Sequence, residues 1–130
     1  MVGRADPDAE IAKYADVLAA MGNESRLRIV QLLLGAHPDG LFAGELGEQL
    51  GIAPSTLSHH LDKLRAESVL TVERQGTFLR YRVDADALSG LLRFLWSQCC
   101  TGNPIVDPAT LTPTASTRTG RLTAGKGKRT

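Results

Sequence analysis

The sequence has few of the features that mark a disulfide-rich or a membrane protein. It holds two cysteines in 130 residues, Cys99 and Cys100, which are too few for a disulfide framework. No apolar run approaches the roughly 20 residues that cross a bilayer, and the opening MVGRADPDAEIAKY has no apolar signal-peptide segment. We therefore expect a cytoplasmic protein with reduced thiols.

A strong charge of one sign is also missing. Fifteen Lys and Arg side chains stand against fourteen Asp and Glu, which gives a net charge of +1 and argues against a general binder of polyanions. The distribution is uneven, because residues 55–82 carry five basic and three acidic side chains and residues 101–130 carry five and one. These two segments are able to meet phosphate groups locally.

Aromatic residues are absent from the last 30 residues, which contain eight Thr, three Pro and four Gly. Such a segment buries too little apolar surface to offset the entropy lost on ordering. We predict a folded domain at residues 1–104 and a flexible basic tail at residues 105–130. The tail either touches DNA weakly through its Lys and Arg side chains or is solvated without a role.

The rest of the chain consists of short amphipathic segments, in a sequence that is 42% hydrophobic. Apolar residues at helical spacing predict helices at residues 8–21, 24–35, 43–50, 55–67 and 85–98. Asp84 is expected to cap the last of these. We expect one apolar face on the first helix, formed by Ile11, Tyr14, Ala15 and Leu18, and a broad apolar stripe on the second, formed by Leu27, Val30, Leu33 and Leu34.

A β-hairpin is predicted in the stretch VLTVERQGTFLRYRV, where apolar and polar residues alternate on both sides of Gln75-Gly76. The expected fold is therefore mainly α with one small hairpin.

Two short helices around the tight turn LGIAPS fit a helix-turn-helix. The outward face of the second helix is short and rich in hydrogen-bonding groups, as reading the major groove requires. Ser55 and Thr56 at its start suit a phosphate, and Ser58, His59 and Lys63 are placed to reach base edges or a neighbouring phosphate. The same pattern also fits an ordinary surface helix.

The hairpin that follows favours DNA binding. Arg74, Arg80 and Arg82 are expected to be exposed on its strands, with a flexible tip at Gln75-Gly76-Thr77. A basic hairpin directly after a helix-turn-helix is a wing, which reaches along the DNA backbone or into the minor groove. We predict a winged helix-turn-helix whose wing contacts DNA through Arg74, Gln75, Arg80 and Arg82.

Three segments in this order resemble the ArsR/SmtB family of metal-responsive winged-helix repressors. They are AMGNESRLRIVQLLL, GELGEQLGIAPSTLSHHLDKLRAESVL and VERQGTFLRYRVD, and the resemblance covers roughly residues 10–100. It implies a homodimer built from the first and last helices and a double-stranded operator with two-fold symmetry. Ser68 stands where the family commonly has glycine, and this departure puts little of the resemblance in doubt because that position only ends a helix.

The last helix supports a homodimer independently of the resemblance. Leu88, Leu91, Leu92 and Leu95 form one stripe, and further apolar side chains lie on its other faces. A helix that is apolar over so much of its surface needs more than one neighbour.

The adjacent cysteines end that helix, in WSQCC. From the residues alone, Cys99 and Cys100 are a soft-metal site, a redox pair or two small apolar residues, and Cys99 extends the apolar stripe. Thiolates select thiophilic species such as As(III), Sb(III), Cu(I) or Zn(II). An enzyme is not expected, because neither cysteine sits in an anion loop and no His/Asp constellation surrounds the pair.

The resemblance narrows the choice of inducer. Phe42 and Gly44 occupy the positions of one sensor group's Cys-x-Cys, and ALSGLLRFLW lacks the histidines of another group's zinc site. What remains is similar to the arsenic-sensing subgroup with adjacent cysteines after the last helix. The resemblance implies a repressor, without a permanent cofactor, that leaves its operator when As(III), antimonite or methylated As(III) binds Cys99 and Cys100. The alternative is a repressor that uses the same thiols to respond to oxidation, zinc or copper.

Overall fold

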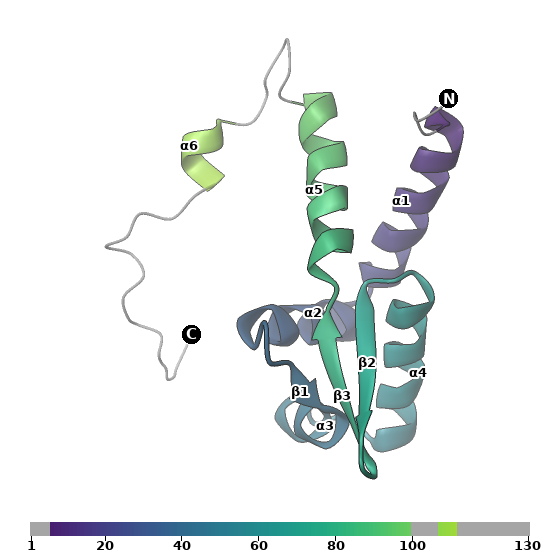
Figure 1. Ribbon diagram of the computed structural model, residues 1–130, viewed down its shortest axis with the longest axis vertical. Coiled ribbons are helices and arrows are strands. Elements are labelled where there is room, and N and C mark those ends of the chain that lie inside the picture. The colour runs from purple at the N-terminus through teal and green to yellow at the C-terminus, as the bar shows by residue number, and fades with distance from the viewer. Residues whose placement is uncertain (1–5, 100–106, 112–130) are drawn as a thin grey trace. The chain divides into compact units, whose positions relative to one another are not determined.

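The computed structural model describes residues 6–99 and 107–111 (Figure 1). The helices are α1 (Pro7–Met21), α2 (Glu24–Gly35), α3 (Ala43–Leu50), α4 (Pro54–Ala66), α5 (Ala85–Cys99) and α6 (Pro108–Leu111). The strands are β1 (Leu41–Phe42), β2 (Leu70–Gln75) and β3 (Phe78–Val83). The chain divides into two compact units, Met1–Leu91 and Leu92–Thr130. Within the described residues, no helix combines the length and apolar character needed to cross a membrane.

Local signals set the helix boundaries, and the five predicted helices are all present. Asn23 caps α2 by accepting a hydrogen bond from the backbone N of Arg26 at 3.1 Å, and Asp84 caps α5 in the predicted way by accepting from the N of Ala87 at 3.1 Å. Gly51 ends α3 with a left-handed φ of 67°, which glycine adopts without steric cost.

The sheet has three antiparallel strands in the order β1-β3-β2. Gln75 pairs with Phe78, so the turn consists of Gly76 and Thr77. The prediction that Gln75 belongs to a flexible tip is therefore wrong, because Gln75 is the last paired residue of β2.

Strand β1 was not predicted, because two residues are too short to show alternation. Leu41 and Phe42 pair with Tyr81 and Arg80 of β3. Gly40, just before β1, has a φ of 78°, and a Cβ there would collide with the backbone carbonyl of Tyr81. Glycine is therefore needed at position 40 for β1 to lie against β3.

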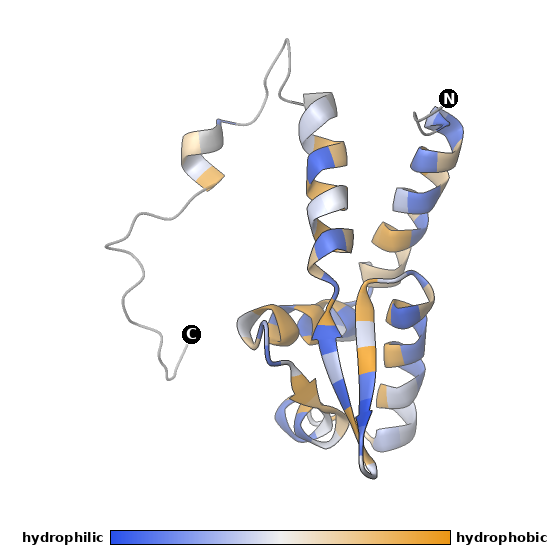
Figure 2. Ribbon diagram, viewed as in Figure 1, coloured by the Kyte–Doolittle hydropathy of each residue, from blue (hydrophilic) through white to orange (hydrophobic). Residues whose placement is uncertain are grey.

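The core lies between α2, α3, α4 and the inner face of the hairpin. Its fully buried side chains are Ile29, Val30, Leu33, Leu46, Leu61, Leu64 and Val69. Figure 2 shows the alternation of apolar and polar residues along β2 and β3 that turns one face of the hairpin inward. Helix α4 packs alongside β2 in this arrangement.

The predicted apolar faces of α1 and α2 are buried only in part in the single chain. In α1, Tyr14 is buried together with Val17 and Ala20, whereas Ile11 and Leu18 are 58% and 45% exposed. In α2, Val30 and Leu33 are buried, whereas Leu27 and Leu34 are 54% and 52% exposed. Both helices are apolar on more than one side, so periodicity alone does not select the side that packs.

Ser68, the residue that stands in place of the family's glycine, has a φ of 61°. It lies just after α4, where the backbone N of Val69 donates to the carbonyl of Leu64 at 3.0 Å. This left-handed conformation favours glycine at the end of a helix, so serine adopts it at a cost in conformational energy.

The cysteine pair and the predicted tail lie largely outside the residues that the structure describes. Cys99 is the last residue of α5, and Cys100 lies outside the described residues. Of residues 105–130 the structure describes residues 107–111, which include the short helix α6. The division at residue 104 and the flexibility of the tail stay predictions.

Candidate nucleic-acid interface

Helix α4 presents a polar face to solvent because three leucines fix its orientation. Leu57, Leu61 and Leu64 are at most 4% exposed. All five side chains predicted to contact DNA from this helix are exposed, namely Ser55, Thr56, Ser58, His59 and Lys63. The structure thus brings these residues together on one surface.

The start of α4 is open as well. Pro54 occupies the first turn, and the N-cap residue Ala53 makes no side-chain capping bond. The first backbone N–H groups of a helix have no partner within the helix, and together with the helix dipole they favour an anion. This end of α4 therefore suits a phosphate group between Ser55 and Thr56.

His60, next to the reading face, holds α4 to the rest of the domain. Its Nδ1 lies 3.3 Å from Nη1 of Arg26, and Nε of Arg26 donates to the carbonyl of Ala20 at the end of α1. Burial lowers the pKa of His60, and the charges of Arg26 and His59 lower it further. A neutral His60 accepts the hydrogen bond from Arg26.

Arg26 is a positioning residue that the sequence did not reveal. It connects α1, α2 and α4 through one guanidinium group. No local pattern distinguishes it from the neighbouring Arg28, which forms an exposed ion pair with Glu24 in its own helix at 2.6 Å.

The wing differs from prediction in what its arginines do. Arg80 is half-buried, donates from Nε to Gln75 Oε1 at 3.3 Å and from Nη1 to the carbonyl of Asp39 at 3.1 Å, and lies 4.1 Å above the ring of Phe42. The prediction that Arg80 is exposed is wrong, because the loop before β1 supplies partners that lie far away in sequence.

Arg82 is tied down in the same way. Its Nε donates to the carbonyl of Pro38 at 3.1 Å, and its Nη1 pairs with Glu73 Oε1 at 2.7 Å. This pairing lowers the pKa of Glu73. The side chain of Arg82 is still 34% exposed, so the loop reduces its predicted exposure without removing it.

Arg74 keeps the predicted exposure. It precedes the end of β2 by one residue, pairs across the hairpin with Leu79 through the backbone, and forms no side-chain ion pair with any described residue. The guanidinium of Arg74 is therefore the wing cation that a phosphate group meets most readily. Gln75 is half-buried, since its amide oxygen already accepts from Arg80.

The outer face of the wing also carries an aromatic pair that the sequence analysis did not single out. The rings of Phe42 and Phe78 are 5.7 Å apart, and Phe78 is 64% exposed. Together with Arg80 they join β1 to β3. Phe42 is thus part of the wing, at the position where the resemblance placed another group's cysteine.

Two helices joined by a tight turn, with a polar exposed face on the second and a three-stranded wing after it, define a winged helix-turn-helix protein. A protein-family model described as "Helix-turn-helix domain" matches residues 21–73. The chain belongs to the ArsR family of winged-helix transcriptional regulators, as its relatives and structural neighbours show.

Three of these similarities give its extent. The transcriptional activator HlyU of Vibrio cholerae is 30% identical over 92 residues, which cover 71% of this chain and 82% of HlyU. The nodulation protein NolR of Rhizobium meliloti is 36% identical over 85 residues, 65% of this chain and 66% of NolR. The structure of an ArsR-like regulator from Rhodococcus sp. RHA1 superposes with a TM-score of 0.59 at 27% identity, over 68% of this chain and 80% of that one.

Proposed function

We propose that this protein is a homodimeric repressor that binds a two-fold symmetric operator and releases it when a trivalent arsenical binds Cys99 and Cys100. The observation that carries DNA binding is the exposed polar face of α4, which starts at an uncapped helix end and is followed in the chain by a wing with an exposed arginine. In this proposal the protein is not an enzyme, because the thiols bind the inducer without converting it.

The DNA contacts divide by their chemistry. Ser55, Thr56 and Arg74 bind phosphate groups and position the protein. Ser58, His59 and Lys63 lie further along the exposed face and read base edges in the major groove. His59→Ala should therefore reduce the ratio of operator to random-DNA affinity, measured by gel shift on the DNA upstream of the protein's own gene. An unchanged ratio in this variant and in a Ser58→Ala variant would contradict base reading by this face.

Dimer formation is supported by apolar side chains that the single chain leaves uncovered. α1 exposes Ile11 and Leu18, and α5 exposes Leu92 at 65%, Leu95 at 42% and Trp96 at 37%. One structural neighbour, the winged-helix domain Mb0332 of Mycobacterium bovis, is described as homodimeric. A symmetric dimer places two reading helices on half-sites about one helical turn apart, roughly 34–36 Å.

The dimer is tested by charge at its proposed contact. Leu92→Asp would bury an unpaired carboxylate between the subunits and should give monomers in sedimentation, with little operator affinity. Arg93→Asp, at the next and also exposed position, is the control for a general effect of charge on α5. A well-folded parent protein that sediments as a monomer at micromolar concentration would contradict the dimer.

The inducer site is proposed from the adjacency of two thiols where α5 ends. One relative, from Halobacterium salinarum and 30% identical over 79 residues, carries a name that assigns it to an arsenical resistance operon. A methylated trivalent arsenical needs two protein ligands, whereas inorganic As(III) needs a third from another source. We therefore expect at least as strong a response to methylated As(III) as to inorganic As(III).

Release requires the inducer to prefer the DNA-free form by a coupling free energy of about 1–3 kcal/mol. Cys99→Ser and Cys100→Ser should each leave operator binding intact and abolish release by the arsenical under strictly reducing conditions. Normal release in the double serine variant would remove the pair from the mechanism.

A thiol redox sensor is the second candidate. One HlyU structure from Vibrio cholerae, 29% identical to this chain, is that of the reduced protein. Parallel titrations of the operator complex with As(III), methylated As(III), antimonite, Zn(II) and peroxide separate the two. Release by peroxide but by none of the arsenicals would favour a disulfide switch at Cys99 and Cys100.

A further inference from the structure

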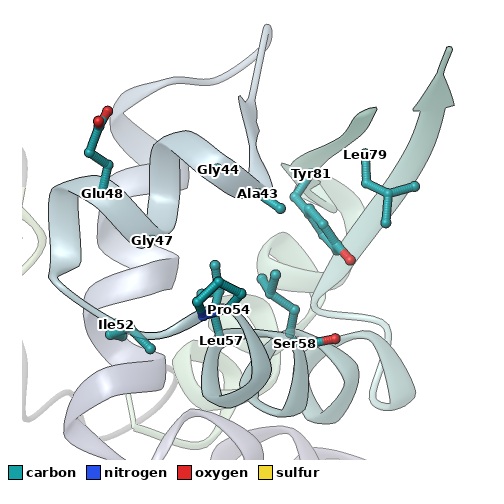
Figure 3. A pocket seen from close by; sticks show the side chains of 11 residues that line it. Ala43, Gly44, Gly47, Glu48, Ile52, Pro54, Leu57, Ser58, Leu79 and Tyr81 are labelled. Atoms are coloured by element: carbon teal, nitrogen blue, oxygen red, sulfur yellow. The ribbon is translucent and has the colours of Figure 1, made fainter. Parts of the chain in front are cut away.

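A pocket of about 460 Å³ lies within the unit that holds the helix-turn-helix, between α3, the turn, α4 and β3 (Figure 3). Its volume falls in the range of roughly 300–1,000 Å³ that is typical of small-molecule sites. Among the described residues of this unit, Arg74 is not part of the pocket wall.

The wall of the pocket is mostly aliphatic. Ile52 and Pro54 come from the turn, Leu57 and Leu61 from α4, and Leu79 from β3. Such a wall favours an apolar ring over a sugar or a nucleotide, because it offers large apolar contact area and few hydrogen bonds.

Small residues on α3 keep the pocket open on its third side. Figure 3 shows the methyl group of Ala43 facing Tyr81. Gly47 also lines the pocket, where a Cβ would lie 3.2 Å from the carbonyl oxygen of Ile52. A side chain at position 47 would therefore require the turn to shift by a few tenths of an ångström, whereas Ala43 borders the open pocket.

One polar residue of the pocket is buried and forms no side-chain hydrogen bond with any described residue. Tyr81 is 4% exposed, its ring runs from β3 into the space between α3 and α4, and no described residue forms a hydrogen bond with its hydroxyl. Burial raises the pKa of this phenol. A buried hydroxyl without a hydrogen bond is unfavourable, so a ligand that bonds to it gains affinity there.

The remaining polar residues of the wall are Glu48 and Ser58. Glu48 is exposed, and Figure 3 shows its carboxylate pointing away from Tyr81. The mostly aliphatic wall disfavours burial of an anion, whereas a neutral hydroxyl or N–H group suits the hydroxyl of Tyr81.

We propose that this pocket binds a small, neutral, mainly apolar ring compound with one hydrogen-bonding group, and that its occupation weakens DNA binding. The coupling follows from position, because Ser58 belongs both to the pocket wall and to the proposed reading face. The ligand also packs between α4 and β3, so it changes the spacing of reading helix and wing. Binding itself does not depend on the proposed function, whereas the effect on DNA does.

Binding is tested on the full chain without DNA by titrating ¹⁵N-labelled protein with phenol, indole and 1-naphthol, and with 1-naphthoate as the anionic counterpart of the last. We expect saturable shifts of the backbone amides at residues 43–48, 52–61 and 79–81 for at least one neutral probe. 1-Naphthoate should bind at least about tenfold more weakly than 1-naphthol, since its carboxylate loses solvation against an aliphatic wall and a tenfold ratio requires only about 1.4 kcal/mol.

Three variants locate the site. Ala43→Leu fills the pocket and should abolish the shifts. Gly44→Ala is the matched control on the same helix, because a Cβ there meets no atom within 4 Å, and it should bind as the parent does. Tyr81→Phe keeps the ring and removes the hydroxyl, and should weaken binding by about 5–10-fold, the usual value of one hydrogen bond.

The results that overturn the proposal are equally specific. They are the absence of saturable binding by all three neutral probes, equal binding by the parent and a folded Ala43→Leu variant, or shifts confined to other residues. For the effect on DNA, the probe should lower operator affinity by about 5–150-fold in the parent and in the double Cys→Ser variant, but not in Ala43→Leu. Probe binding without any loss of operator affinity would refute the coupling. If the parent protein does not bind an operator, the proposed function is refuted, and the amide shifts alone then test the pocket.

Discussion

Arg74→Ala and Arg80→Ala remove the same charge from the same wing, and the structure predicts opposite consequences. Arg80→Ala removes two hydrogen bonds and a cation–π contact that join β3 to Phe42 and to the loop before β1. At about 0.5–1 kcal/mol for each of these interactions in a half-buried setting, the free energy of unfolding should fall by about 2 kcal/mol. Arg74→Ala removes no contact of this kind and should stay within about 0.5 kcal/mol of the parent.

DNA binding should separate the two variants in the reverse sense. A phosphate contact contributes about 0.9 to the slope of log affinity against log salt concentration, so losing Arg74 from both subunits should flatten the slope by about 1.8. Arg80→Ala should weaken binding at every salt concentration with little change of slope, because the wing is displaced but the count of phosphate contacts is kept.

The assays are urea unfolding at matched protein concentration and fluorescence anisotropy with labelled operator between about 50 and 200 mM salt. Thr77→Ala, at the exposed tip, is the control and should match the parent in both. A stable Arg80→Ala variant whose salt slope falls as far as that of Arg74→Ala would refute the division of roles.

Three further predictions concern stability. Gly40→Ala should lower the free energy of unfolding by about 3 kcal/mol, because φ is 78° and the Cβ meets the Tyr81 carbonyl, whereas Gly35→Ala, with open space around it, should not lower it. Ser68→Gly should raise it by about 1 kcal/mol, since φ is 61°; an unchanged melting temperature would argue against strain there. Because the pKa of His60 is lowered from 6.5 in the folded state, acidification through pH 6.5 protonates the unfolded chain first and should reduce stability. His60→Gln should remove this part of the pH dependence, and a parent that gains stability on such acidification would contradict the reasoning.

The sequence predicts best what is local and periodic. The helix-turn-helix follows from leucine spacing in α4, the cap of α5 follows from Asp84, and the hairpin follows from alternation. The exposed reading face needs only the position of Leu57 and the helical repeat, so it too follows from the sequence.

What the sequence does not predict depends on partners distant along the chain. The sequence predicts Arg80 and Arg82 as exposed cations of the wing. In the structure, Arg80 donates a hydrogen bond to the carbonyl of Asp39, and Arg82 donates one to the carbonyl of Pro38. The choice between apolar faces of α1 needs the position of α2 and α4. A serine does not indicate a positive φ, so the left-handed backbone of Ser68 is not predictable from the sequence. The pocket beside Tyr81 forms only where α3, α4 and β3 come together in the fold.

The short tip of the wing has a consequence for how such a protein diverges. Two residues, Gly76 and Thr77, close the hairpin, and the neighbouring Phe78 and Arg74 are exposed. Residues that pack in the core begin further back along both strands, so insertions or deletions at the tip leave the folded domain intact. The length of the wing, and with it the stretch of DNA that the wing contacts, can therefore change in evolution. Such changes leave α4, the hydrogen bond between Arg26 and α4, and the core as they are.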